Sequence, residues 1–193
     1  MGSSPIAALS RVVTRHGPGR VRSLRKDETM VRNCFAKFAT GVVVVSMRDS
    51  NKIHGITVNC FTTVSLNPPL VLVSIDRQAR AHGLLAGQSF TINVLTGDQA
   101  QLAVHFSGHP QDNLAIVWLP GYFVPRLAGA LAHLECQPWD AYDVADHTLY
   151  VGLVSACAYR SGASALGFFE SRYVQIAEDN EGGRSNERCC DSD

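Results

Sequence analysis

The first patterned segment of the chain carries apolar residues at a spacing of three and four, which predicts an amphipathic helix from Met30. The apolar stripe consists of Val31, Cys34, Phe35 and Phe38. We expect Gly41 to end this helix, because glycine adopts the left-handed conformation of helix C-termini at little cost. A helix therefore opens the predicted domain.

The segments that follow have the short period and the β-branched residues of strands. Val42–Met47 reads VVVVSM, and Ile53–Leu66 reads IHGITVNCFTTVSL, with turn-forming residues 48–52 between them. These two strands are predicted to form a hairpin. The prolines at 68–69 interrupt the pattern, and Leu70–Ile75 follows as a third strand that we expect to be buried on both faces, because nearly all of its residues are apolar.

The second half of the chain predicts further short elements. They are a helix over 80–86 ending at Gly87, a strand over 90–95, a helix over 97–108 capped by Asp98, and strands over 130–143, 147–160 and 166–176. Residues 109–125 have no regular pattern, and we expect Trp118 and Tyr122 to anchor them by packing. Short strands separated by turns favour a barrel or sandwich over a doubly wound sheet.

Composition limits the classes of partner. At 193 residues with 46% apolar side chains, the chain has the size of one soluble domain with a full core. Basic and acidic residues balance at 17 each, so we expect no nucleic-acid partner. No apolar run reaches the roughly 18 residues of a membrane helix, so we expect no membrane partner. Six cysteines without a CxxC pair favour a reducing cytoplasm.

The two ends of the chain carry opposite charge. Residues 1–29 hold six basic side chains against two acidic ones, and residues 178–193 hold six acidic against two basic ones. We predict a basic, disordered extension over 1–29, a folded domain over 30–176, and an acidic, disordered tail over 177–193.

Common catalytic motifs are absent. The sequence holds no GxGxxG, no GxxxxGK[ST] and no GxSxG motif. His105 and His109 are four residues apart but lack the glutamate of HExxH, so a zinc site is a distant alternative and we expect no metal.

The hydroxyl-rich stretch Thr57–Ser65 has two interpretations. Threonine is common on the solvated face of an antiparallel sheet. Short hydroxyl and amide side chains can equally form the wall of a ligand site, where they allow close approach of a planar heterocycle and supply hydrogen bonds. The pattern alone leaves both open.

Five segments in one order resemble the flavin reductase family. They are FATGVVVVS (38–46), HGITVNCFTTVSLNPPLVLVSI (54–75), FTINVL (90–95), residues 99–103 with Phe106, and ADHTLYVG (145–152). The resemblance extends over residues 30–176 and is greatest to the small NAD(P)H:flavin oxidoreductase component of two-component monooxygenases. It implies a mainly β fold, a homodimeric split β-barrel of the FMN-binding, Greek-key type with two or three short helices.

The resemblance also implies an activity. The protein would reduce FMN or FAD with NADH or NADPH and supply reduced flavin to a partner monooxygenase acting on aromatic or natural-product substrates. Hydride would pass directly between the bound cofactors, so no side chain is expected to act as a catalytic group. The alternative is a repurposed barrel that binds flavin or another small molecule without turning over nicotinamide, as a cyclisation catalyst or binding module.

The implied flavin contacts lie mainly in the hydroxyl-rich stretch. They are Thr40, Thr57, Val58, Asn59, Cys60, Thr63, Val64, Ser65, Arg80, Asn93 and Phe106. Phe106 has core packing as its other interpretation. In the segment after the third strand the family offers serine and threonine to the flavin phosphate, whereas this chain offers Arg77, Arg80 and His82. The guanidinium groups of the two arginines can bind phosphate.

The implied nicotinamide contacts are His147, Arg172 and Tyr173. His147 lies in a motif that the family places beside the nicotinamide, and we expect it to donate a hydrogen bond that orients the pyridine nucleotide. Ala145 occupies a position where the family has glycine, a difference that matters only if the backbone there has a positive φ.

Overall fold

The computed structural model describes residues 28–177, so the extensions predicted at the two ends lie largely outside the described residues. The chain divides into two compact units, with the boundary between Phe35 and Ala36. In the first unit, helix α1 (Glu28–Phe35) is shorter than predicted. Gly41 does not end it, because Gly41 belongs to strand β1 (Thr40–Gly41) and pairs with Gly167.

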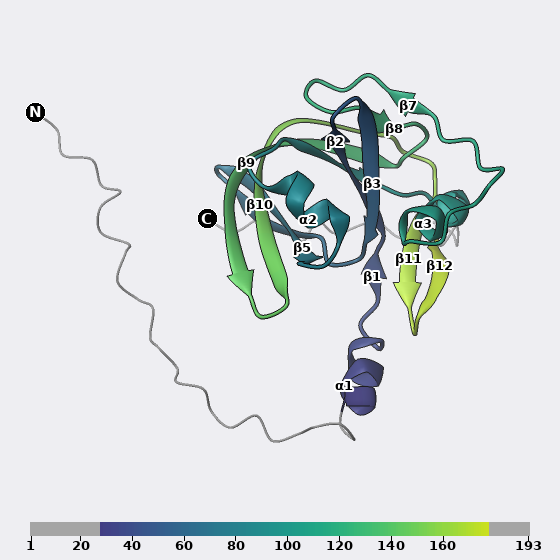
Figure 1. The fold of residues 1–193 in the computed structure, drawn as a ribbon. Helices are drawn as coiled ribbons and strands as arrows, with labels where there is room; N and C mark the ends of the chain where they lie inside the picture. The colour runs from purple at the N-terminus through teal and green to yellow at the C-terminus, as the bar shows by residue number, and fades with distance from the viewer. Residues whose placement is uncertain (1–27, 178–193) are drawn as a thin grey trace, which may run out of the picture. The chain divides into compact units, whose positions relative to one another are not determined.

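The second unit is built around one antiparallel sheet of seven strands (Figure 1). In chain order the strands are β2 (Val43–Asp49), β3 (Lys52–Val58), β4 (Thr62–Leu66), β5 (Pro69–Asp76), β6 (Phe90–Val94), β9 (Ala132–Val144) and β10 (His147–Tyr159). Their order in the sheet is β3-β2-β6-β9-β10-β5-β4. The predicted hairpin of the first two strands is confirmed as β2 and β3.

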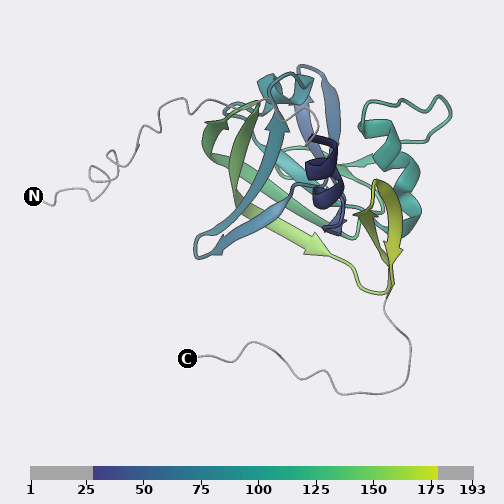
Figure 2. The same cartoon turned by 90° about the horizontal axis from the view of Figure 1, so that it is seen from below.

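Smaller elements cover this sheet. They are α2 (Arg80–Leu85), the 3₁₀ turn η2 (Gly97–Gln99), α3 (Ala100–Phe106), the pair β7 (Trp118–Leu119) and β8 (Arg126–Leu127), and the strands β11 (Ala165–Phe169) and β12 (Arg172–Ile176), which form a sheet with β1. Figures 1 and 2 show β11 and β12 beside α3. The prediction of a mainly β fold with two or three short helices is confirmed.

Strand β2 is buried on both of its faces. Val43, Val45 and Met47 belong to the main core, together with residues of β5, β6 and α2. Val44 lies on the opposite face, in a second core with residues of α3, β8 and β11. Two apolar environments explain the continuous VVVV run. Burial on both faces was predicted for β5, and this prediction was wrong, because the residues of β5 alternate between buried and partly exposed positions.

The predicted strand over 53–66 is two strands at opposite edges of the sheet. The chain leaves the sheet after Val58 and re-enters it at Thr62 beside β5. At this crossing the Cys60 thiol donates a hydrogen bond to the carbonyl oxygen of Ser74 at 2.9 Å. The end of β3 is thereby held against β5, so the sheet curves back on itself around the main core.

Two local predictions in the second half are corrected. The helix after β6 is capped by Thr96 and Gln99, which exchange hydrogen bonds as a capping box, and not by Asp98. In the segment 109–125, Trp118 packs as predicted, with its ring 5.9 Å from that of Phe106. Tyr122 does not anchor the segment, because its side chain is 82% exposed. Its backbone N–H instead binds the carboxylate of Glu135.

None of the helices described within residues 28–177 is long and apolar enough to cross a membrane.

The turn between β9 and β10 requires a left-handed residue, and the chain supplies alanine there. Ala145 has φ of +53°. A side chain in this conformation costs about 1–2 kcal/mol, because Cβ approaches the following carbonyl oxygen, whereas glycine avoids that contact.

We therefore expect Ala145→Gly to raise the free energy of unfolding by about 1 kcal/mol, measured by urea denaturation. Ala141→Gly is the matched control, because Ala141 is an exposed residue of β9 with ordinary strand geometry. There the extra backbone freedom of glycine should lower stability by about 0.5–1 kcal/mol. Equal losses in both variants would contradict the strain at Ala145.

Candidate functional site

Strand β3 forms the floor of a groove made of three adjoining cavities, all of which include Thr57. The largest, of about 590 Å³, lies where β3 meets α2 and α3. A second, of about 280 Å³, lies between the end of β3 and the ends of β5 and β10. The third, of about 130 Å³, lies between β3, β11 and β12. Figure 1 shows β3 between α2 and α3.

The position of α3 over β3 depends on a small residue at Gly55. A Cβ atom at Gly55 would lie 2.7 Å from the ring of Phe106, well inside contact distance. The Phe106 ring therefore fits only against a glycine. Phe106 packs on the second core and also lines the largest cavity, so both interpretations of this residue are compatible with its position.

Thr57 connects the same two elements by a hydrogen bond. Its hydroxyl group donates to the carbonyl oxygen of Ala103 in α3 at 2.8 Å. The hydroxyl proton is therefore used within the protein, while the oxygen keeps acceptor capacity toward the groove. A threonine in β3 thus fixes the wall of the groove as well as lining it.

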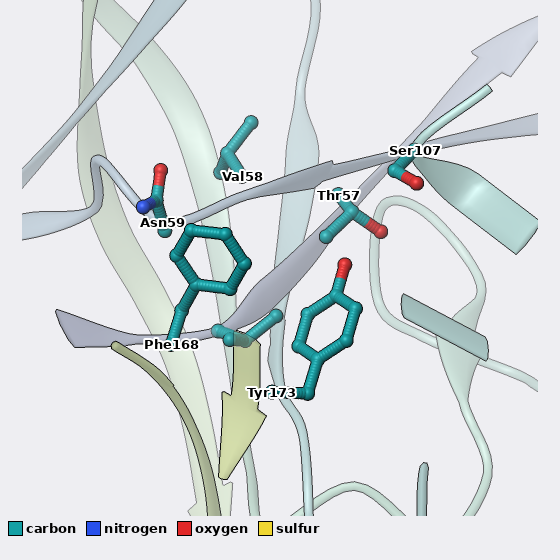
Figure 3. Close-up of a pocket in the computed structure, with 7 residues that line it drawn as sticks. Thr57, Val58, Asn59, Ser107, Phe168 and Tyr173 are labelled. Carbon is teal, nitrogen blue, oxygen red and sulfur yellow. The ribbon is translucent and has the colours of Figure 1, made fainter. Parts of the chain in front are cut away.

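The smallest cavity combines apolar faces with polar edges (Figure 3). Its lining residues are Val42, Thr57, Val58, Asn59, Ser107, Phe168 and Tyr173. Figure 3 shows the hydroxyl group of Tyr173 pointing toward Thr57. Burial raises the pKa of Tyr173, although a hydrogen bond with Ser107 lowers it in part, so the phenol is neutral at neutral pH.

The side-chain amide of Asn59 is available to hydrogen-bond a ligand. Its exposed side chain lines two of the three cavities and makes no hydrogen bond to any residue within 28–177. An amide offers two donors and one acceptor oxygen. It can therefore pair with a ligand that carries both carbonyl oxygens and ring nitrogens.

His147 faces the same groove from β10 and lines the second cavity with Asn59 and Cys60. Its Nδ1 lies 2.8 Å from Oδ1 of Asp146. The hydrogen bond to His147 lowers the pKa of Asp146, so this carboxylate is ionised at neutral pH and acts only as an acceptor. Nδ1 therefore carries the proton. Nε2 is then an acceptor in the neutral ring and a donor in the imidazolium, so the donor role expected of His147 stays a prediction.

Cys60 contributes no nucleophile to the groove. Burial raises the pKa of its thiol, an effect that the hydrogen bond to Ser74 offsets only in part. The thiol therefore stays protonated at neutral pH and serves as a small wall residue.

Two basic residues, His54 and Arg80, lie along the largest cavity. Arg80 forms an ion pair with Asp49, and its side chain is 70% exposed. Burial and the nearby Arg80 guanidinium lower the pKa of His54, so His54 is neutral at neutral pH. Of the three basic residues singled out in this segment, only Arg80 lines the groove. His82 instead hydrogen-bonds Thr148 at 3.1 Å.

Asn93 was predicted as a ligand contact, and the structure contradicts this. Its side chain is completely buried. Nδ2 donates to the carbonyl oxygen of Val44 at 2.9 Å, and Oδ1 accepts from the backbone N–H of Leu127 at 2.7 Å. These bonds satisfy the amide inside the protein, so Asn93 is a structural residue.

Other predicted contacts lie away from the groove. Thr63, Val64 and Ser65 belong to β4 at the other edge of the sheet and line none of the three cavities. Arg172 is exposed on β12 and lines none of them either. Thr40 is not a lining residue, but its hydroxyl oxygen is buried and finds no hydrogen-bond partner among the described residues.

The lining residues that the sequence patterns missed include His54, Ser107 and Phe168. Ser107 follows α3 and Phe168 lies in β11, so both reach the groove only through tertiary packing. Within residues 28–177 no three histidine, cysteine or acidic side chains gather as potential metal ligands. His105 and His109 bind Gln111 and Ser107, respectively.

The groove can bind a flat, partly polar molecule between apolar faces, with hydrogen bonds at its edges. The thiol of Cys60 stays protonated and bonded to Ser74, so it offers the groove no activated nucleophile. The geometry suits chemistry supplied by bound cofactors.

Comparison with known proteins identifies similar chains. Residues 35–177 match the family described as flavin reductase like domain. An NADH-dependent flavin reductase from a Rhodococcus species is 41% identical over 138 residues, which cover 68% of this chain and 77% of the relative.

Two solved structures extend this similarity. The NADH:FAD oxidoreductase of Streptomyces globisporus C-1027, in complex with NAD and FAD fragments, has a TM-score of 0.74 at 35% identity and covers 81% of this chain and 96% of its own. The styrene monooxygenase flavin reductase of Pseudomonas putida S12 has a TM-score of 0.71 at 37% identity, covering 76% and 97%.

Proposed function

Because the chain belongs to the flavin reductase family, we propose that it transfers a hydride from NADH to FMN or FAD and supplies reduced flavin to a monooxygenase. The family predicted from the order of the sequence segments is thus confirmed. The chain is an NADH:flavin oxidoreductase of the two-component monooxygenase type. The observation that carries the proposal is the groove along β3, which Asn59 and His147 line together.

The groove residues fit a flavin. The apolar side chains of Val58 and Phe168 can contact the faces of a planar ring system, and the unpaired amide of Asn59 matches its alternating carbonyl and nitrogen edge. The smallest cavity alone, at about 130 Å³, is too small for the whole molecule. It adjoins the 590 Å³ cavity at Thr57, so the combined groove has room for the remainder.

A bound flavin supplies the electron-accepting ring that takes a hydride from reduced nicotinamide, so the protein needs no covalent catalyst. The protein contributes orientation, which can account for several kcal/mol of a barrier. Asn59 fixes the ring edge, and Thr57 holds α3 in place as the wall. Tyr173 stays a neutral phenol because its pKa is raised, and it closes the groove on the β12 side.

His147 positions the nicotinamide in this proposal. With Nδ1–H bonded to Asp146, the neutral ring offers Nε2 as a hydrogen-bond acceptor. The carboxamide N–H of a nicotinamide is a suitable donor. His147 therefore orients the nucleotide as an acceptor and takes no proton in the reaction.

Arg80 is the proposed contact of the flavin phosphate. It lines the largest cavity, and its ion pair with Asp49 uses Nη2, which leaves further N–H donors on the guanidinium group. The carboxylate of Asp49 at the same time offsets the positive charge that Arg80 presents to a phosphate. This arrangement favours moderate phosphate affinity and exchange of the flavin between turnovers.

The activity is tested by NADH oxidation under air, followed at the nicotinamide absorbance band with FMN and with FAD. We expect turnover far above the rate without protein, because the groove brings the two cofactors together. Parallel assays with NADPH identify the preferred nucleotide. Absence of oxidation with all four pairs would overturn the proposed function and favour a barrel that only binds flavin.

Two single variants should separate the two cofactor sites. Asn59→Ala should raise KM for flavin about tenfold and leave KM for NADH within about twofold. His147→Ala should raise KM for NADH about tenfold and leave KM for flavin within about twofold. The reason is that each variant removes one hydrogen bond to one cofactor. Thr62→Ala, on β4 outside the three cavities, is the control for Asn59. Equal effects of both variants on both constants would disprove the assignment.

We also propose that the chain forms a homodimer. The support is a set of exposed apolar side chains on the edge strand β4 and the outer half of β9, namely Val64, Leu66, Trp139, Tyr142 and Val144. Large exposed apolar side chains on sheet edges commonly mark protein interfaces. Light scattering should give twice the 20.9 kDa of one chain. A mass of one chain at micromolar concentration would exclude the dimer.

A further inference from the structure

A fourth cavity lies outside the groove, where β7 and β8 meet the paired ends of β9 and β10. Its volume is about 340 Å³, and none of its lining residues lines the groove. Leu119, Leu131 and Tyr159 provide much of its apolar wall. Arg126, His133 and Arg160 are its basic residues. The proposed reaction leaves this cavity without a role.

Arg126 lines this cavity, and one of its donors is unsatisfied. Its Nε atom is buried and has no hydrogen-bond partner among the described residues. Leaving a buried charged donor unpaired is unfavourable, because the group loses its hydrogen bonds to water and gains none in the protein. Arg126 lies in β8, and its backbone is held by pairing with Leu119 of β7. A shift of the strand that would move the guanidinium into solvent is therefore opposed by this pairing.

The other two basic residues are oriented by backbone carbonyl groups. Nη2 of Arg160 donates to the carbonyl oxygen of Gly129 at 2.7 Å. Nε2 of His133 lies 2.8 Å from the carbonyl oxygen of Leu127, and because a carbonyl only accepts, this nitrogen carries the proton. Each residue is therefore fixed by one bond and keeps polar atoms for a ligand.

No acidic group within residues 28–177 neutralises these two arginines. The ion pairs of this part of the chain join Lys37 to Glu170, Arg80 to Asp49 and His147 to Asp146. The carboxylate of Glu135, on the same strand as His133, is bound by the backbone N–H groups of Tyr122 and Phe123. The cavity therefore has two positive charges and no counter-ion of its own.

We propose that this cavity binds a carboxylate attached to an apolar body. Guanidinium groups bind carboxylates by paired, charge-assisted hydrogen bonds, and the two arginines that line this cavity offer such groups. The apolar wall favours an organic acid over a bare inorganic anion. At about 340 Å³ the cavity falls within the usual range of small-molecule sites.

Two sources can supply this carboxylate. One is a free organic acid. The other is the chain itself, because residues 178–193 contain Glu178, Asp179, Glu181, Glu187, Asp191 and Asp193. Both sources share the chemistry that the cavity recognises, and a competition experiment distinguishes them.

The test uses the full-length protein with benzoate as the probe and benzamide as its uncharged analogue. Calorimetry should show benzoate binding, with benzamide at least about tenfold weaker, because only the carboxylate pairs with the arginines. In a ¹H–¹⁵N spectrum the Nε–H signal of Arg126 should move on addition of benzoate. Absence of binding both to the native chain and to the variant whose tail acids are replaced by amides, or equal binding of benzamide, would overturn the proposal.

Two variants locate the binding. Arg126→Met keeps an apolar side chain of similar length and should weaken benzoate binding about tenfold or more. Arg160→Met, at an exposed position, should weaken it similarly and tests the site even if the first variant folds poorly. Arg48→Met is the matched control, because Arg48 does not line the cavity. This variant should bind benzoate with unchanged affinity. Unaltered affinity in both cavity variants would refute the site.

A third variant of the full chain identifies the source. All six acidic residues of 178–193 are replaced by their amides. Tighter benzoate binding in this variant would show that the tail carboxylates occupy the cavity in the native chain, whereas unchanged affinity would assign the cavity to a free acid. The readout is binding and not turnover, so its result is independent of the reductase assay.

Discussion

The burial of strand β2 on both faces is the constraint on which the rest of the structure depends. Val43, Val45 and Met47 require an apolar interior on one side, which the curved sheet provides. Val44 requires cover on the other side, which α3, β8 and β11 provide. Because β3 is the edge strand beside β2, the elements that cover β2 also come to flank β3, and the groove forms between them. The position of the binding site is therefore a consequence of core packing.

A buried polar network holds the outer cover in place. Asn93 forms hydrogen bonds with the backbone of β2 and of β8. The hydroxyl of Ser46 donates to the carbonyl oxygen of Pro125 at 2.9 Å, and the carboxylate of Glu135 accepts from the backbone N–H of Phe123. A segment without regular structure would otherwise leave its backbone groups unsatisfied against the sheet. Such a network is strong when every member is paired, and it fixes one arrangement of the chain. This network explains why an asparagine is found in the middle of an apolar strand.

The sequence predicted those features that depend on neighbouring residues. The β2–β3 hairpin follows from local turn chemistry, and so does the end of α2 shortly before Gly87, which has φ of +68°. The division of 53–66 into β3 and β4 does not, because strand patterns contain no information on which edge of a sheet a strand joins. Thr57 and Thr63 look alike in sequence for the same reason, yet only Thr57 lines the groove. Family resemblance identified the correct chemistry, whereas residue roles required tertiary geometry.

Hydrogen-bond satisfaction separates the polar residues that hold the fold from those available to a ligand. Asn93 is fully paired and fully buried, so it stabilises the structure and contacts no ligand. Asn59 and Nε2 of His147 have free hydrogen-bonding capacity and face one cavity, which is the condition for recognising a polar ring edge. In the fourth cavity, Arg126 and Arg160 have no acidic partner among residues 28–177, which is the corresponding condition for binding an anion. The same physical criterion thus selects the cofactor groove and points to a second, anionic ligand elsewhere on the sheet.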